Sequence, residues 1–297
     1  MNTKAIFILL TISLIALNIK TQAQPVQELE QAYAENSTKK LKQVLDNWAN
    51  EIKPITEKEI AKMSEIEREA YNVFEAYYNP HDLASRGGSD FGNDAYLKFN
   101  YFLVQNQLNV HQADKVYYTE PEIRDFVVKM IMKKFTTISV ERRDQSIALF
   151  LSRPLKDEQL FVGAYGPHGS EVVDSTQRLV KTITNFRPRM IQTKATPLYL
   201  NAKYDEVLQR FPGDEPIPAG QVGIKKLDTK KKRFLENYVK VYDYRPLTPP
   251  TVGAVIFDKD MEYAMIRYGM IMQGGIAFLK KESGKWVIIS AKNTSRE

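Results

Sequence analysis

The sequence predicts an α+β protein, with a helical N-terminal region, a mixed region and a C-terminal antiparallel β-meander. Two observations carry that prediction. No glycine precedes Gly87, and apolar residues in that stretch recur at the three- and four-residue spacing of amphipathic helices. After residue 250, β-rich runs alternate with two- and three-residue turns, and connections that short join antiparallel neighbours. Helices early and a hairpin ladder late are typical of the α+β class.

The first 23 residues differ in composition from the rest of the chain. Lys4 lies near the start, 11 of the 13 residues at 5–17 are apolar, and Thr21 and Ala23 supply small residues at a cleavage position. This is the order of a secretory signal peptide. Thirteen apolar residues rise about 20 Å as a helix, which is too short for a hydrocarbon core of about 30 Å. We therefore expect export from a bacterial cell, to the periplasm or the medium, with cleavage after Ala23.

The mature chain is expected to be soluble, because no later stretch approaches the length of an apolar membrane span. It contains no cysteine and three histidines. These counts exclude a disulfide framework, thiolate metal sites and thiol nucleophiles. A chain of 297 residues buries a sizeable core without disulfides. We expect a mostly helical region over residues 24–115 and an α+β region with the meander over residues 116–297.

Two or three amphipathic helices are predicted at the start of the mature chain. The first has the apolar stripe Leu41, Val44, Leu45, Trp48 and Ile52 and ends at Pro54. Thr56 and Glu59 then have the spacing of a capping box. The stripe that follows is Met63, Ile66, Ala70, Val73, Phe74 and Tyr77, and Asn79-Pro80 ends it.

The middle of the chain is less regular. Residues 96–110 are rich in aromatic and β-branched side chains, which favours strand over buried helix. Propensity and turn signals then predict these elements in order: a helix starting at Thr119-Glu120-Pro121, strands over residues 136–140 and 146–151, a helix over 172–186, a strand over 197–200, a helix over 203–211 capped by Asn201, and an exposed connection over 211–223.

The tail is the clearest β segment. Its strands are predicted over residues 252–257, 263–272, 276–281 and 286–290. Trp286, after the turn Ser283-Gly284, is expected in the core. The run from Gly274-Gly275 to Gly284-Lys285-Trp286 and the β-branched residues after it resembles the final hairpin of cone-shaped NTF2-like domains. That resemblance implies a hairpin and no catalytic residues.

Residues 163–171 place His168, Ser170 and Glu171 on a glycine-containing loop. One interpretation is acyl transfer at a helix N-terminus. The simpler one, in which Ser170 caps the next helix, is favoured because a base and a nucleophile two residues apart rarely face each other. The sequence holds no G-x-S-x-G, P-loop or dinucleotide-binding motif.

Metal binding is also disfavoured. The candidates His81, Asp82, Asp90 and Asp94 lack the alternating oxygen ligands and terminal Glu of a calcium loop. H-E-x-x-H is absent, and the three histidines are widely spaced. We predict no catalytic residue, no cofactor and no metal.

A basic run is the strongest binding signal. Residues 225–233 hold six cations, opposed by Asp228 alone. The predicted anion-binding residues are Lys230, Lys231, Lys232 and Arg233, which we expect to face water because unpaired buried charge is costly. The aromatic residues that follow, Phe234, Tyr238, Tyr242 and Tyr244, suit stacking on bases or sugars. The alternative is a solvated face that keeps the protein soluble.

Export makes nucleic acid a poor partner, which leaves an anionic glycan or a lipid head group. The sequence thus favours an exported, non-catalytic binding or interaction protein with an anionic or small-molecule ligand. The alternative is a secreted or periplasmic hydrolase whose site residues are dispersed in the sequence. A cleft with convergent carboxylates, or a histidine bonded to an acid and facing a pocket, distinguishes the hydrolase.

Overall fold

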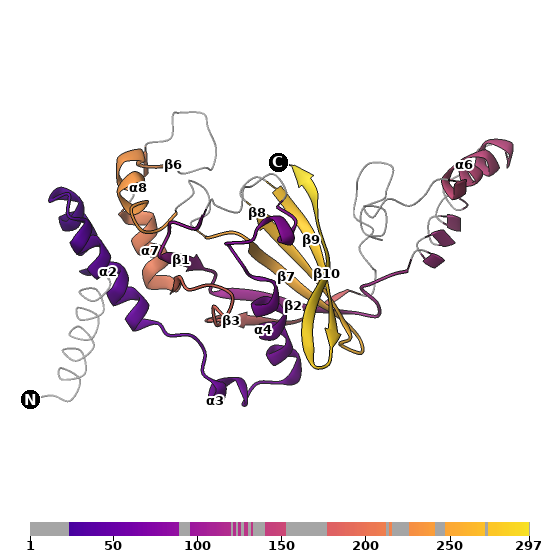
Figure 1. Ribbon diagram of the computed structural model, residues 1–297, viewed down its shortest axis with the longest axis horizontal. Coiled ribbons are helices and arrows are strands. Elements are labelled where there is room, and N and C mark those ends of the chain that lie inside the picture. Colours follow the sequence, from indigo (N-terminus) through magenta and orange to yellow (C-terminus); the bar gives the residue numbers. More distant parts are fainter. Residues whose placement is uncertain are drawn as a thin grey trace, which may run out of the picture.

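The computed structural model places one six-stranded sheet at the centre of the protein, with helices on one side and a smaller helical cluster beyond it (Figure 1). It describes residues 24–88, 96–119, 121–122, 124–125, 128–129, 132, 140–152, 177–211, 214–215, 226–240, 247–270 and 273–296. Helices come first and the strand ladder last, so the α+β prediction is confirmed.

The sheet has the order β10-β9-β8-β7-β2-β3. Strands β7 to β10 form an antiparallel meander, as predicted, and β2 pairs parallel with β7 and antiparallel with β3. Residues from both sides of position 115 therefore share one sheet. The strands are β2 (Gln107–Ala113), β3 (Arg178–Thr184), β7 (Thr251–Asp258), β8 (Tyr263–Met270), β9 (Gln273–Glu282) and β10 (Lys285–Arg296).

The N-terminal helices begin and end where their caps predict. Residues 24–34 are helical, and Ser37 caps α2 (Thr38–Glu51) by accepting from the Lys40 N–H. The segment after Pro54 forms two helices. The Thr56–Glu59 capping box starts the short α3 (Glu57–Ile60), and Ser64 donates to Glu67 at the start of α4 (Glu65–Tyr77). A second capping box lay within the predicted helix.

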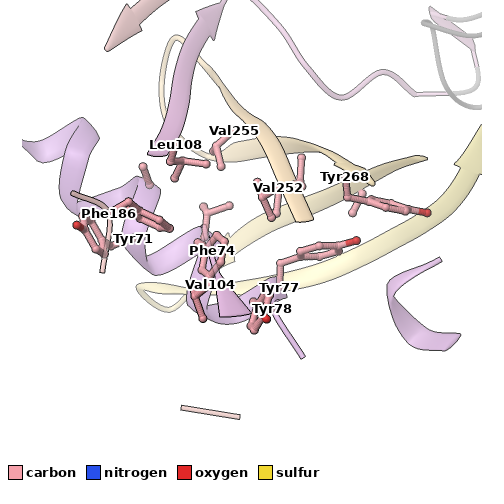
Figure 2. Packing of buried hydrophobic residues seen from close by; sticks show 14 of the residues in the cluster. Tyr71, Phe74, Tyr77, Tyr78, Val104, Leu108, Phe186, Val252, Val255 and Tyr268 are labelled. Atoms are coloured by element: carbon pink, nitrogen blue, oxygen red, sulfur yellow. The ribbon is translucent and has the colours of Figure 1, made fainter. Parts of the chain in front are cut away.

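Helix α4 packs across the sheet and builds the main core. Its Tyr71, Phe74 and Tyr77 are almost wholly buried in one cluster with strand residues such as Leu108 and Val255, and Tyr77 lies beside Tyr268 of β8 (Figure 2). The apolar stripe read from the sequence is therefore the buried face of α4, as helical periodicity requires.

A second cluster lies beside this core. It joins residues 24–34 and α2 to α7 (Ala202–Arg210), α8 (Thr229–Leu235) and the parallel pair β1 (Tyr101–Val104) and β4 (Thr196–Tyr199). Trp48 of α2 stacks on Tyr204 of α7, with ring centroids 4.1 Å apart, and its indole N–H donates to the Tyr199 carbonyl at 2.9 Å. The predicted Asn201 cap of α7 is confirmed, since its side chain accepts from the Tyr204 N–H.

The segment after β3 is tied to α4 by polar contacts. Arg189 binds the carboxylate of Glu75, which is 3% exposed, through both its guanidinium and its backbone N–H. Gln192 donates to the Glu75 and Ala76 carbonyls at 2.8 and 2.7 Å. Arg187 binds Glu59 at 2.7 Å. The contacts of Arg189 and Gln192 hold the connection between β3 and β4 against α4, and the Arg187–Glu59 pair holds it against α3.

Two predictions for the middle of the chain are wrong. Residues 146–151 belong to α6 (Val140–Ser152), and residues 178–184 of the predicted helix form β3. An apolar run of six residues fits either structure, so local pattern does not decide between them. The pairing partner decides between strand and helix. Strand β3 pairs with the distant β2, whereas α6 projects away from the sheet (Figure 1). Residues 136–139 and 172–176 lie outside the described residues.

The predicted final hairpin is present. Ser283 and Gly284 form its two-residue turn, both with positive φ (49° and 79°), as a type I′ turn requires. Trp286 is 7% exposed, packs on Phe257 with ring centroids 5.6 Å apart, and donates to the Glu69 carboxylate at 2.6 Å. Its predicted place in the core is confirmed.

Candidate functional site

Helix α8 carries the predicted anion-binding residues. Asp228 caps it by accepting from the Lys230 and Lys231 backbone N–H groups at 2.8 and 2.9 Å. The same two bonds, led by that from Lys231, hold the pKa of Asp228 below its usual value. At the other end of α8, Phe234 and Leu235 are buried in the second cluster. The helix is therefore fixed at both ends, although it has only seven residues.

The four consecutive cations do not all face water. Lys230 and Arg233 are exposed and, at i and i+3, lie on the same side of α8. Lys232 is partly buried. Lys231 turns inward, where its ammonium pairs with Glu30 at 2.5 Å, and its side chain is 22% exposed. The expectation that all four are solvated holds for the outer pair and is wrong for Lys231, because Glu30 supplies the partner that a half-buried charge needs.

Aromatic side chains surround Lys231 rather than a ligand surface. Its Nζ atom lies 5.3 Å from the Phe211 ring centroid and 5.9 Å from that of Tyr33. Phe234 is 6% exposed, so it is not available to stack on a base or sugar. Tyr238 is partly buried and packs edge-to-face on Tyr101. The exposed surface of α8 is thus cationic without being aromatic. Tyr242 and Tyr244 lie outside the described residues.

A second polar group lies on the sheet face that α4 does not cover. Gln177 accepts from the Arg267 guanidinium at 3.0 Å through its Oε1, and its Nε2 lies 3.1 Å from His111 Nδ1. The amide can donate only through Nε2, so His111 Nδ1 is the acceptor and the imidazole proton sits on Nε2. Burial first, and then the charge of Arg267, lower the pKa of His111. This imidazole is therefore neutral at neutral pH.

The surroundings of this polar group are mixed. Asn109 accepts from Thr182 at 3.0 Å across β2 and β3. Tyr117 stacks on Tyr263, with ring centroids 5.1 Å apart, and meets Phe278 edge-on. Sequence analysis missed the group, because its members come from three separate segments and share no motif. Their alternation along strands was the one signal available.

Most of the remaining sequence candidates fall outside the part of the chain that the structure describes. His168, Ser170, Asp90 and Asp94 lie outside the described residues. His81 is held at Nδ1 by Thr193 at 3.3 Å and packs edge-on against Phe102, and burial lowers its pKa. Across the described residues, no three His, Asp or Glu side chains gather closely enough to hold a metal ion.

No protein-family model, curated protein or solved structure matches this chain. Among the described residues, every helix is too short or too polar to cross a bilayer.

Proposed function

We propose that the mature protein is an exported, non-catalytic binding protein, and that it binds the anionic groups of a glycan or of a lipid head group through α8. The observation that carries this proposal is the exposed pair Lys230 and Arg233, which lie about one turn apart on a short helix. The cap at one end and buried apolar residues at the other hold this helix in place. Because Asp228, Phe234 and Leu235 already hold the helix, a ligand orders little besides the two cationic side chains.

The inward turn of Lys231 supports the same conclusion. Its pairing with Glu30 neutralises one cation and fixes the helix against residues 24–34. The two cations that remain exposed are therefore the ones whose field reaches solvent, and an exposed field of one sign attracts a polyanion. Such attraction weakens with added salt, because the contacts release counterions and are screened.

The test measures binding of the purified mature protein to heparin, to lipopolysaccharide and to vesicles with anionic lipid, at low and at physiological salt. We expect binding at low salt that weakens steeply as salt rises. The double variant Lys230→Glu/Arg233→Glu should lose it and unfold at the temperature of the native protein, since exposed charges contribute little to stability. Lys231 is left in place because its loss would break an ion pair.

The matched control reverses two exposed lysines elsewhere, Lys259→Glu/Lys285→Glu, which changes the net charge by the same amount. If both double variants lose binding equally, net charge rather than α8 is responsible. Binding that is indifferent to salt, or absent from all three probes at low salt, contradicts the proposal. Heparin binding without vesicle binding identifies a glycan ligand, and the reverse identifies a lipid.

Export is part of the proposal. The basis is the charged start and short apolar run of residues 1–23, which lie outside the described residues. Intact mass of the exported material should correspond to a chain that begins at Gln24. Material that retains residues 1–23 after export contradicts this processing.

A further inference from the structure

Strand β3 forms one edge of the central sheet. Among the residues that the structure describes, it pairs with β2 and with no second strand. Four consecutive residues of β3, Arg178 to Lys181, are exposed, including Leu179 at 56% and Val180 at 39%. Consecutive side chains of a strand point to opposite faces, so both faces are open at this edge. An edge of this kind presents a row of backbone N–H and C=O groups to an incoming strand.

The register sorts the exposed side chains by chemistry. Lys181 lies opposite Val110 and Arg178 opposite Gln112, so both cations are on the face that α4 covers. Leu179 lies opposite His111 on the other face, and a bulge leaves Val180 as the extra residue. One face of the edge therefore carries Arg178, which donates to Gln112, and Lys181, which pairs with Glu67 at 2.9 Å. The other face carries Leu179.

The charges at both edges of the sheet oppose self-association. Strand β3 carries Arg178 and Lys181, β10 at the other edge carries Lys285, Lys292 and Arg296, and neither carries a free acid. Two copies of the protein could pair through either edge strand. Each such pairing, whether of β3 with β3, β10 with β10 or β3 with β10, brings like charges together. Like charges directly opposite each other destabilise a strand pair. The same charges favour a strand that carries carboxylates.

The two edges differ in how open they are. Along β10, the turn after η1 (Ala84–Arg86) closes on the backbone, because a Cβ atom added to Gly87 would lie 3.1 Å from the Lys292 nitrogen. Trp286 and Ile288 of β10 pack toward the core. Among the described residues, Arg178 to Lys181 of β3 remain exposed, although Glu67 of α4 pairs with Lys181 at 2.9 Å.

We propose that β3 is a docking edge for an extended segment of another protein in which acidic and apolar residues alternate. The segment extends the sheet by main-chain hydrogen bonds, places its carboxylates beside Arg178 and Lys181, and lays its apolar side chains beside Leu179. Main-chain pairing supplies affinity in this mode of recognition, and the alternating side chains supply specificity. This edge is separate from α8, so the inference is independent of the proposed anion binding.

The probe is a capped peptide of about eight residues that alternates Glu and Val, the usual length of a strand. Three peptides are its controls: one alternating Lys and Val, one with the same Glu and Val residues in two blocks, and one alternating but N-methylated on its pairing edge. We expect the alternating acidic peptide to bind to the full mature protein. Each control should bind more weakly by a factor of about ten or more. The first has the opposite charge, the second lacks the alternation and the third lacks hydrogen-bond donors on its pairing edge.

A charge-swap variant tests the site without depending on loss of binding. Arg178→Glu/Lys181→Glu should bind the Lys–Val peptide and lose the Glu–Val peptide, a reversal that misfolding does not produce. Lys181 pairs with Glu67 at 2.9 Å, so a second variant, Arg178→Glu alone, keeps that ion pair and should show a smaller shift in the same direction. The variant Lys230→Glu/Arg233→Glu should bind the acidic peptide as the native protein does.

Amide hydrogen exchange locates the contact. Bound acidic peptide should slow exchange of backbone amides in β3 and leave those of α8 unchanged. Three results overturn the proposal: binding that survives N-methylation, protection at α8 instead of β3, or a native protein that dimerises through β3 in preference to binding the peptide. Failure of heparin binding at α8 has no bearing on any of these readouts.

Discussion

Arg189 and Lys231 both form ion pairs with residues far away in the sequence, but the acidic partner is buried in one pair and exposed in the other. Arg189 covers Glu75, whose side chain is 2% exposed, and meets it with a backbone N–H and both ends of its guanidinium. Lys231 meets Glu30, whose side chain is 43% exposed, through one ammonium contact. The sheet region therefore depends on buried charge that must stay paired, whereas the α8 region keeps its charges near water.

This difference indicates where substitution is tolerated. A carboxylate that has lost its solvent depends on its partner, so the segment that carries Arg189 is fixed relative to α4. Lys230 and Arg233 of α8 are exposed, and exchanging them alters the surface field more than the fold. A surface that recognises other molecules by charge is accordingly expected on α8 and at the sheet edges rather than between the sheet and α4.

The largest expected effect is that of Arg189→Ala. It leaves the carboxylate of Glu75 buried without its guanidinium, and removing one partner of a buried pair costs about 3 to 5 kcal/mol of unfolding free energy. Urea unfolding followed by circular dichroism measures the loss. The double variant Glu75→Gln/Arg189→Ala should be more stable than Arg189→Ala, because it leaves no unpaired charge at position 75. Equal stability of the two would show that Glu75 carries no uncompensated charge in the single variant.

Trp286→Ala tests the contact of β10 with the core and with Glu69 of α4. The substitution removes a ring that is 7% exposed and packs on Phe257, so we expect a loss of about 3 to 5 kcal/mol. Trp286→Phe keeps most of the ring and loses the bond to Glu69, which also pairs with Lys281 at 2.9 Å. It should cost about 1 kcal/mol. A loss under about 1 kcal/mol for Trp286→Ala would mean that β10 contributes little to the core.

These two sites show what could be predicted from sequence. Trp286 was placed in the core because the strand and its turn are local signals, and the meander needed nothing from elsewhere in the chain. The Glu75–Arg189 pair was not predictable, because 113 residues separate its members and neither stands in a motif. The identity of β3 and α6 depends in the same way on partners far along the chain.

The candidate sites divide along the same line. The basic run at α8 is contiguous, so it was visible in the sequence, but the inward turn of Lys231 needed the position of Glu30. The group of His111, Gln177 and Arg267 joins three segments that only the sheet brings together. Local sequence patterns thus predict helices, strands and charged runs. Contacts between residues far apart in the sequence decide which of those charges are exposed to solvent.

Acid should weaken the contact between α3 and the segment that carries Arg187. Hydrogen bonds from the Thr56 backbone and hydroxyl, and then from Arg187, lower the pKa of Glu59 to about 2. A carboxyl whose pKa is lower in the folded state stabilises the protein above its unfolded value and loses that effect as pH falls toward the folded one. The stability difference between the native protein and Glu59→Gln should therefore be full above pH 4.5 and disappear as pH approaches 2.

The measurement is the thermal midpoint of both proteins between pH 7 and pH 2. Other carboxylates also titrate in this window, so the informative quantity is the difference between the two midpoints and not either midpoint alone. Glu65→Gln is the control, because Glu65 is exposed in the first turn of α4 and no contact to Arg187 involves it. A difference for Glu59→Gln that is constant over the whole range would contradict the assigned pKa.

The smallest effect is expected in the α8 region, from Asp228→Ala. Asp228 accepts two backbone N–H groups at the start of α8, and loss of such a cap costs about 0.5 to 2 kcal/mol. Asp228→Asn keeps an oxygen acceptor without the charge and should recover most of the loss. Because α8 presents Lys230 and Arg233, a frayed helix should also bind heparin less tightly, although Asp228→Ala makes the surface more cationic. Net charge alone predicts the opposite change in affinity. Asp228→Ala and Asp228→Asn remove the same charge, so equal heparin binding by the two variants, tighter than that of the native protein, would show that charge acts without a fixed helix.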